Sequence, residues 1–500
     1  MATPTTTPES PGTAPPVEQA RAHYAKRLAA IVIGVVIVRL AVLLLTPLDL
    51  FYDEAQYWYW SQELALGYFS KPPLIGWLIA ATTAICGDSE GCVRSAAPLF
   101  HGITTMLVFG LASKLYAPRT AFFAALGYLF AIAVSASSLL ISTDVPLLVC
   151  WVAGLWAFVR YTSAPSVKLA VGFGLAIAIG LNAKYAMIYF PLCALAYLAF
   201  TRDMRPMLKR FDLWLGIGVG LLGFLPNLIW NIQHEFITFS HTSENISGSG
   251  LTFDLASFLE FFGSQFAVAG PILFVGLLFA LFKHWRSDTP KADRLMLFFS
   301  LPILTLLGLQ AFQSSANYNW AATAFPALII VTTAILMDRA RWQWVRWNLI
   351  TCMAMAGIML AGALAALTVR PDHPIIASTN LEDMFGWAEH ADELSRRLDR
   401  LEPDTIVTVG RRYSAGFAYY LREREEPLRA FRQEGSPARN HFEFTAPWGR
   451  PGPGERAVII SPGNISPLRG ARLVGVVEAD DGVAPFRSNS YLFLAVGPQE

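Results

Sequence analysis

The amino-acid sequence predicts a polytopic α-helical membrane protein that carries a small α/β domain at its C-terminal end. Hydrophobic residues make up 54% of the 500 residues and charged residues only 15%, whereas roughly a quarter of a typical soluble protein is charged. Apolar runs of about the length that crosses a bilayer recur up to residue 369, and the chain then becomes charged and rich in Pro and Gly. A formal net charge of +1 argues against a nucleic-acid-binding protein.

The N-terminal segment is expected to be a disordered cytoplasmic tail, residues 1–27, followed by a retained membrane span. The tail is rich in Thr, Pro and Ser and ends in a basic cluster. The apolar run from Leu28 to Pro47 is longer than the core of a signal peptide, and no small-x-small cleavage site follows it. Arg39 lies inside this run, and we expect it to face the bundle or the interface because a lipid-facing charge is costly.

About eleven spans are expected in a transmembrane domain at residues 28–369, with interfacial helices in the outer loops. A spanning helix needs about 20 apolar residues. After the first run, the apolar runs cover residues 94–113, 118–137, 144–161, 167–182, 184–201, 211–231, 266–282, 295–312, 320–337 and 344–369. The stretches 72–86 and 253–263 are apolar but short, so we expect them to lie in or near the membrane interface.

Lysine and arginine residues lie mostly on one side of the membrane if the N-terminus is cytoplasmic and successive spans cross in alternate directions. The cytoplasmic segments hold eighteen residues, Arg21, Lys26, Arg27, Lys114, Arg119, Arg160, Lys168, Arg202, Arg205, Lys209, Arg210, Lys283, Arg286, Lys291, Arg294, Arg339, Arg341 and Arg346. The opposite loops hold Lys71, Arg94 and Lys184. Because Lys and Arg favour cytoplasmic loops, this asymmetry places the C-terminal domain outside.

Residues 370–500 are expected to form that outer domain. Short strand-like runs at 405–410, 457–461, 473–477 and 491–496 alternate with helical stretches at 380–401 and 413–422. No motif in the domain carries recognisable chemistry, so we expect a lid or a docking platform. Cys86 and Cys92 flank a short outer loop, and the sequence leaves open whether they form a disulfide, because it does not show the distance between them.

Polar residues gather at the outer ends of the spans. They are two acids in an aromatic loop, a lysine before two prolines, an acid at a helix start, a lysine in a tight turn, two histidines and an asparagine: Asp53, Glu54, Lys71, Asp144, Lys184, His234, His241 and Asn319. Each has an ordinary explanation, such as an aromatic belt, a headgroup anchor or a helix cap. Together they predict a concave polar site that is open to a substrate in the outer leaflet.

The motifs that carry these residues resemble the GT-C superfamily of membrane glycosyltransferases. The first outer loop contains Asp-Glu-Ala before aromatic residues and later Lys-Pro-Pro-Leu, and matching turns follow at 142–146, 184, 230–234 and 319–320. The chain is similar to the dolichyl-phosphate-mannose protein mannosyltransferase type, which includes bacterial transferases of aminoarabinose or galacturonic acid. The resemblance covers residues 28 to about 340 and implies a GT-C fold.

This resemblance implies an enzyme of the bacterial inner membrane that takes a sugar from a polyprenyl-phosphate donor. The acceptor would be lipid A, lipopolysaccharide or another envelope component on the periplasmic side. It further implies that Asp53 is the base or orients the acceptor, and that Lys71 lies near the donor. The aminoarabinose transferases carry Glu before Lys-Pro-Pro, whereas this chain carries Ser70, which favours a galacturonosyl or other core-sugar relative.

The residues themselves suggest a mechanism of single displacement with inversion. Asp53 or Glu54 could take the proton of the acceptor hydroxyl, and Lys71 and Lys184 could stabilise the phosphate that leaves. Asp144 could hold a lysine, a metal or the acceptor, so a divalent cation is compatible with the site without being required. We expect Tyr57, Ser70, His234, His241 and Asn319 to contribute to substrate binding.

Two other functions fit part of the pattern. A protein O-mannosyltransferase would share this site and differ in its acceptor. A transporter or flippase for a lipid-linked sugar would be expected to show inverted repeats and polar groups near the membrane midplane. The sequence shows no internal repeat and places its polar groups at one rim, which favours an enzyme.

Overall fold

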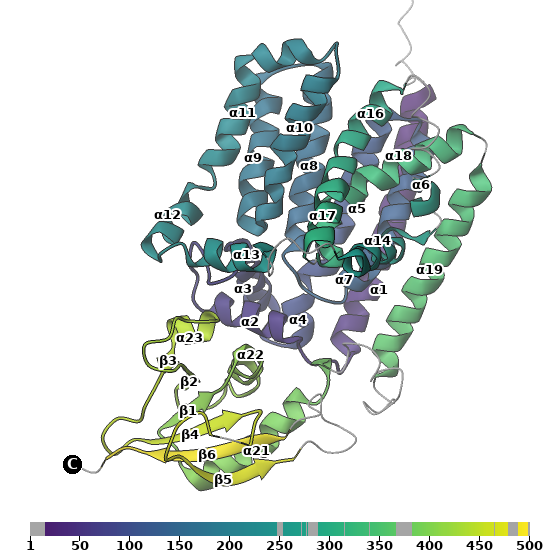
Figure 1. Cartoon of the computed structure of the whole chain (residues 1–500). Coiled ribbons are helices and arrows are strands. Elements are labelled where there is room, and N and C mark those ends of the chain that lie inside the picture. Colours follow the sequence, from purple (N-terminus) through teal and green to yellow (C-terminus); the bar gives the residue numbers. More distant parts are fainter. Residues whose placement is uncertain are drawn as a thin grey trace, which may run out of the picture.

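The computed structural model shows a helical bundle with an α/β domain packed against one end (Figure 1). It describes residues 16–247, 254–271, 273–276, 278, 289–314, 316–339, 341–366, 383–464, 466–478 and 489–498. Within these ranges, 7 helical segments are long and apolar enough to cross a membrane: Pro16–Leu45, Glu90–Leu115, Asp144–Ser163, Phe211–Gln233, Lys291–Gln313, Tyr318–Asp338 and Trp342–Ala365. The predicted class, a helical membrane domain with a small α/β domain, is confirmed.

The other expected spans are shorter helices or lie partly outside the described residues. The runs at 167–182 and 184–201 form α9 (Val167–Ala183) and η1 (Tyr185–Ile188) followed by α10 (Tyr189–Phe200). The run at 266–282 extends beyond α14 (Leu255–Ala269) into residues that the structure describes only in part. Helix α1 (Pro16–Leu45) begins well before Leu28, the expected start of the first span, so the expectation of disorder is wrong for residues 16–27, and residues 1–15 lie outside the described residues.

The expected span at 118–137 is broken, and Arg39 forms hydrogen bonds with residues on both sides of the break. The segment forms α6 (Pro118–Leu129) and α7 (Ile132–Ser137). The buried Arg39 guanidinium, which comes from α1, donates to the Leu129 carbonyl at 2.9 Å and to the hydroxyls of Ser135 and Ser138 at 3.1 and 2.9 Å. An arginine inside a bundle needs such acceptors, and the end of α6 provides a carbonyl that is free to accept. Arg39 therefore faces the bundle, one of the two positions that the sequence left open.

Short helices cover the end of the bundle that faces the α/β domain (Figure 1). They are α2 (Tyr52–Gln62), α3 (Leu74–Cys86), α4 (Glu90–Arg94), α12 (Leu225–Gln233) and α13 (Ile237–Ser247). Helices α3 and α14 correspond to the interfacial helices expected at 72–86 and 253–263. Cys86 and Cys92 form a disulfide with their Cα atoms 5.9 Å apart, which links the end of α3 to α4.

A buried ion pair between Glu54 and Arg94 holds this cap together. The Arg94 guanidinium lies 2.7 Å from Glu54 Oε2 and also donates to the carbonyls of Leu48 and Asp49. The two Glu54 oxygens accept in addition from the backbone N–H groups of Ile141 and Phe51, at 2.8 and 3.1 Å. The pair thereby joins α2, α4, the exit from α1 and the loop before α8 (Asp144–Ser163).

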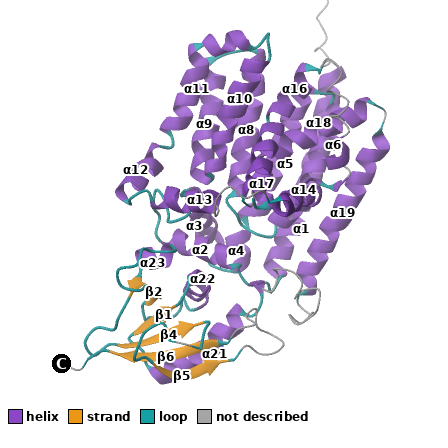
Figure 2. Cartoon of the chain, in the orientation of Figure 1, coloured by secondary structure: helices purple, strands orange, loops and turns teal. Residues whose placement is uncertain are grey.

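The C-terminal domain is a six-stranded sheet in the order β3-β2-β1-β4-β6-β5 (Figure 2). Strands β1 (Thr405–Thr408), β2 (Leu428–Phe431), β3 (Pro447–Trp448) and β4 (Arg456–Ser461) are parallel, and β5 (Arg472–Val477) and β6 (Ser490–Val496) complete the sheet with antiparallel pairing. The expected strands correspond to β1, β4, β5 and β6. Strands β2 and β3 were not predicted, because β2 carries a charged residue at its second position and β3 has only two residues.

The domain docks with the carboxyl edge of its parallel strands toward the bundle. Helix α22 (Arg411–Tyr420) follows β1 and packs on α2, where the Tyr419 and Trp58 rings lie 4.9 Å apart. The Tyr420 hydroxyl accepts from the Leu50 N–H at 2.7 Å. The buried Asp49 carboxylate accepts from the N–H of Trp387, at the start of α21 (Trp387–Leu401), at 2.7 Å. The interface is therefore both aromatic and hydrogen-bonded.

We predict that Arg94→Met strongly destabilises the protein. Removal of one partner of a buried pair leaves an uncompensated charge and typically costs about 3–5 kcal/mol. The thermal unfolding midpoint of the purified protein should therefore fall steeply. Arg396→Met is the matched control, because Arg396 pairs with Glu393 on the surface and such pairs contribute about 0–1 kcal/mol. Equal midpoints for the two variants would show that the Glu54–Arg94 pair does not stabilise the cap.

Asp49 should make stability depend on pH. Burial raises the pKa of this carboxyl to about 7, despite the hydrogen bond from Trp387. The folded protein therefore retains a proton that the unfolded chain releases, so the free energy of unfolding should decline as pH rises from about 4 to about 7. Asp49→Asn should flatten this decline in thermal unfolding measurements, whereas Asp392→Asn, at an exposed position of α21, should not. An unchanged slope in Asp49→Asn would contradict the assignment.

Candidate functional site

Three of the predicted residues meet at the domain-facing end of the bundle. Asp144 begins α8, Lys184 lies between α9 and η1, and Asn319 lies in η3 (Tyr318–Ala324). Asp144 Oδ1 lies 2.7 Å from Lys184 Nζ, and Asp144 Oδ2 accepts from Asn319 Nδ2 at 2.9 Å. The position of Asp144 in the first turn of α8 also favours its negative charge. Asp144 therefore fixes both Lys184 and Asn319.

Lys71 lies beside this group and has no anionic partner among the residues that the structure describes. It is half-buried, and within the described residues its ammonium forms no hydrogen bond or ion pair. Burial lowers the pKa of Lys71, and the positive charge of Lys184 lowers it further, while Asp53 and Asp144 oppose this shift. Two neighbouring ammonium groups, of which only Lys184 is paired with a carboxylate among the described residues, form an arrangement that suits a bound anion such as phosphate.

The loop that carries Lys71 is held in place by the neighbouring elements. The Tyr68 ring stacks on Trp60 at 4.6 Å, and the Tyr68 carbonyl accepts from Thr238 Oγ1 of α13 at 2.8 Å. Asn227 of α12 donates to the Leu66 carbonyl at 2.7 Å. The predicted substrate-binding residue Ser70 is buried in the same loop, next to Lys71.

Asp53 is paired with an arginine of the C-terminal domain. Its half-exposed carboxylate forms an ion pair with Arg411. Arg411 Nε also donates to Gln56 Oε1 at 2.7 Å, and its guanidinium lies 5.2 Å from the centre of the Tyr52 ring. Our sequence predictions did not include Arg411. Its position directly after Gly410, at the carboxyl end of β1, is the signal that could have identified it.

The neighbouring predicted residues Glu54 and Tyr57 differ in their surroundings. Glu54 is buried, and both of its oxygens are occupied by Arg94 and backbone N–H groups. Tyr57 is buried in α2, and burial together with the charge of Asp53 raises its pKa well above the ordinary value. The Tyr57 hydroxyl therefore keeps its proton and is available as a hydrogen-bond donor near Asp53 and Asp144.

The two predicted histidines line a different cavity. His234 stacks on Trp230 at 4.1 Å, and its Nδ1 lies 2.7 Å from the Trp230 carbonyl oxygen. The His241 ring lies 5.3 Å from that of Phe69. Both line a space of about 720 Å³ between the outer loops and the C-terminal domain. The structure therefore does not bring them into the Lys71 and Lys184 group.

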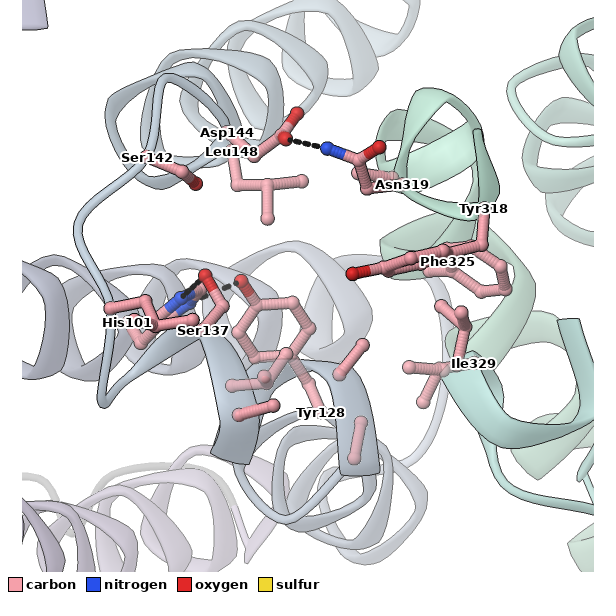
Figure 3. A pocket seen from close by; sticks show the side chains of 17 residues that line it. His101, Tyr128, Ser137, Ser142, Asp144, Leu148, Tyr318, Asn319, Phe325 and Ile329 are labelled. Atoms are coloured by element: carbon pink, nitrogen blue, oxygen red, sulfur yellow. Dashed lines mark hydrogen bonds between the residues drawn. The ribbon is translucent and has the colours of Figure 1, made fainter. Parts of the chain in front are cut away.

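A mostly apolar cavity of about 210 Å³ opens beside Asp144 (Figure 3). Asp144 and Asn319 lie at one end, and apolar side chains such as Leu148, Phe325 and Ile329 line much of the remaining wall. His101 also lines it, with Nδ1 3.2 Å from the Tyr128 hydroxyl and Nε2 3.1 Å from Ser137 Oγ. Our sequence predictions did not include these three residues, although a histidine within an apolar run is itself a signal.

The described residues hold no group of three or more His, Cys, Asp or Glu side chains that could bind a metal ion. Asp53 and Asp144 each pair with a cationic side chain instead. The chemical resources of the site are thus two ammonium groups, a guanidinium, two carboxylates and an adjoining apolar cavity.

Comparison with known sequences identifies related proteins. The profile of the dolichyl-phosphate-mannose-protein mannosyltransferase family matches residues 70–230. The lipid A galacturonosyltransferase RgtD of Rhizobium johnstonii is 31% identical over 412 residues, which are 81% of this chain and 85% of that protein. Undecaprenyl phosphate-alpha-4-amino-4-deoxy-L-arabinose arabinosyl transferase 1 of Pseudomonas fluorescens is 31% identical over 198 residues, which are 36% of this chain and 35% of that protein.

Comparison with solved structures extends the similarity to the whole fold. ArnT from Cupriavidus metallidurans bound to undecaprenyl phosphate superimposes with a TM-score of 0.65 at 17% identity, over 94% of this chain and 99% of that chain. Its apo form gives 0.64 at 16% identity. The C-terminal domain is included in this coverage. With the extended match to RgtD, these similarities show that the chain belongs to the GT-C superfamily of membrane glycosyltransferases.

Proposed function

We propose that this chain transfers galacturonic acid from a polyprenyl-phosphate donor to a lipid A or lipopolysaccharide acceptor at the periplasmic face of a bacterial inner membrane. The observation that carries the proposal is that Asp144, which is paired with Lys184 and lies near Lys71, lines an apolar cavity. A lipid donor with an anionic head group and a hydrocarbon chain needs positive side chains next to an apolar surface. The similarity to RgtD and the presence of Ser70 before Lys-Pro-Pro favour a uronic acid over an aminosugar.

The donor phosphate binds between Lys71 and Lys184 in this proposal. Lys71 has no carboxylate of its own, so a phosphate satisfies its charge more fully than any described side chain does. Asp144 and Asn319 hold Lys184 in position rather than contact the sugar. The polyprenyl chain extends along the apolar cavity, whose walls suit hydrocarbon (Figure 3).

Asp53 is the base that takes the proton of the acceptor hydroxyl. The hydroxyl oxygen forms a bond to the anomeric carbon, the bond between that carbon and the phosphate oxygen breaks, and the proton passes to Asp53. The leaving phosphate is a stable anion that the lysines stabilise, so no acid has to protonate it. Glu54 positions Asp53 through its pair with Arg94, and Arg411 must move aside or share Asp53 with the acceptor.

The orientation that we propose follows from the charge of the loops. The basic loops lie at the bundle end opposite the α/β domain (Figure 1). Because positive loops stay in the cytoplasm, the N-terminal segment, residues 1–27, is on the cytoplasmic side in this proposal. The transmembrane domain, residues 28–369, then presents its site to the periplasm, where the C-terminal domain, residues 370–500, also lies.

Transfer by the purified protein tests the function, and Asp53→Asn tests the base. The wild type should add galacturonic acid to lipid A from its polyprenyl-phosphate donor, with the product measured by mass spectrometry. Asp53→Asn should lower turnover by about 10²–10⁴-fold, the usual effect of losing a general base, while donor binding persists. Asp383→Asn is the control, since Asp383 also pairs with an arginine, Arg412. Turnover near the wild-type value in Asp53→Asn would show that another residue is the base.

The lysine pair should control donor affinity. Lys71→Met should weaken binding of undecaprenyl phosphate by about tenfold or more, because a charge-assisted contact is lost, and should leave the thermal midpoint nearly unchanged. Lys184→Met should weaken binding and also lower the midpoint, because it leaves the Asp144 carboxylate without its partner. Lys209→Met, at an exposed position of η2 (Arg205–Lys209), is the control. Unchanged affinity in Lys71→Met would exclude this phosphate site.

Cysteine labelling tests the orientation. In a variant without native cysteines, Glu425→Cys in the C-terminal domain should react with a membrane-impermeant maleimide in cells whose outer membrane is permeable. Lys209→Cys, at the opposite end of the bundle, should react only after lysis. Both positions are exposed, so accessibility does not distinguish them. The reverse pattern would invert the topology and place the site in the cytoplasm.

A further inference from the structure

Two cavities that share lining residues form a groove, one of them between the outer loops and the C-terminal domain and the other on that domain. The larger, of about 720 Å³, is lined by His234 and His241 of the outer loops and by Arg432 and Arg439 of the domain. The smaller, of about 410 Å³, shares Arg432 and Arg439 and continues to Arg411. The groove therefore leads from the outer ends of the membrane helices to the arginine that is paired with Asp53.

The groove carries positive charge that the described residues leave largely uncompensated. Among them, the Arg432 guanidinium donates to the Glu443 backbone carbonyl at 3.1 Å, and the exposed Arg439 guanidinium meets no carboxylate. The Glu443 side chain is occupied by the Arg439 N–H and by Asn440 Nδ2, at 2.9 and 2.7 Å. Glu235 is the other acid in the lining. A bound anion would therefore find two guanidinium groups available, and guanidinium groups suit phosphate and carboxylate.

An apolar stripe lies beside the outer end of the groove. Ile229 and Ile232 of α12 and Phe236 beyond it are each about half exposed, at 50%, 56% and 46%. On the opposite side of α12, Asn227 and Asn231 are buried. The helix thus turns apolar side chains outward, next to the Gln233 and His234 that line the groove. A ligand with hydrocarbon chains and an anionic head group would match both surfaces.

We propose that this groove is the acceptor site and binds a glycolipid whose phosphate or sugar carboxylate groups are held by Arg432 and Arg439. The inference rests on the proposed function and extends it to the acceptor. The acyl chains lie along the outward face of α12, and the acceptor hydroxyl reaches Asp53 past Arg411. The C-terminal domain is then a substrate-binding domain as well as a cover.

Kinetics with a defined acceptor test this site. The probe is Kdo₂-lipid A, which carries both phosphates and carboxylates, presented to the full-length protein in nanodiscs. The double variant Arg432→Gln/Arg439→Gln should raise the KM for this acceptor by about tenfold or more, since two charged contacts are lost. Binding of undecaprenyl phosphate should not change. Arg472→Gln, on the exposed edge strand β5, is the control and should behave like the wild type.

Four outcomes separate the possibilities. An unchanged acceptor KM in the double variant would overturn the proposal, and an equal loss of donor binding would assign the groove to the donor instead. If the effect of the double variant disappears with dephosphorylated Kdo₂-lipid A, the arginines bind phosphate; if it persists, they bind carboxylate. Either result supports an anionic acceptor.

Direct binding keeps this test independent of the proposed function. If the wild type transfers no sugar, the proposed function fails, but binding of Kdo₂-lipid A still reports on the groove. The double variant should then bind about tenfold more weakly than the wild type, and equal binding would overturn the inference. Arg432→Lys/Arg439→Lys should recover part of the affinity, and thermal unfolding confirms that every variant is folded.

Discussion

The buried pair of Glu54 and Arg94 is the interaction on which the site depends. Both side chains are almost fully excluded from solvent, so each charge requires the other together with the surrounding carbonyls and amides. Because the pair binds the exit of α1, helix α2, helix α4 and the loop before α8, it determines where α2 lies. Asp53 is the preceding residue on α2. Glu54, through its pair with Arg94, thus sets the position of Asp53, the acid proposed to act in catalysis.

The C-terminal domain contributes directly to the site rather than only covering it. The carboxyl edge of its parallel strands faces the bundle, and Arg411 reaches Asp53, Gln56 and Tyr52 from that edge. In open α/β sheets, this is the edge at which ligands are usually bound. A domain in which the sequence shows no chemical motif therefore supplies positive charge along the proposed acceptor path.

Much of the architecture could be predicted because lipid imposes a length and a composition on each span. The side of the membrane on which the polar groups lie was predictable for the same reason. Every second loop between spans lies at the same face of the membrane, and at that face Asp144, Lys184 and Asn319 come together. The assignment of individual acids was harder. Asp53 and Glu54 are neighbours on one helix and point in different directions, and sequence alone does not show which of them Arg94 neutralises.

Other features depend on contacts between distant parts of the chain. Arg411 and Asp53 are 358 positions apart, so no local pattern joins them. Strands β2 and β3 take their structure from pairing with β1 and with each other rather than from their own short sequences. The carbonyl that ends α6 likewise accepts a hydrogen bond from Arg39, a residue of another helix.

The Cys86–Cys92 disulfide makes this part of the structure depend on whether the surrounding compartment oxidises thiols. Between the two cysteines lies Asp88, which accepts from Trp58 Nε1 of α2 at 2.7 Å through its side chain and from the Tyr419 hydroxyl of α22 through its carbonyl. One short cross-linked loop therefore fastens the cap of the bundle to the outer domain. Disulfides persist where thiols are oxidised, as in the periplasm and not in the cytoplasm. The thiol-oxidising machinery of the cell envelope would thus take part in maturing this enzyme.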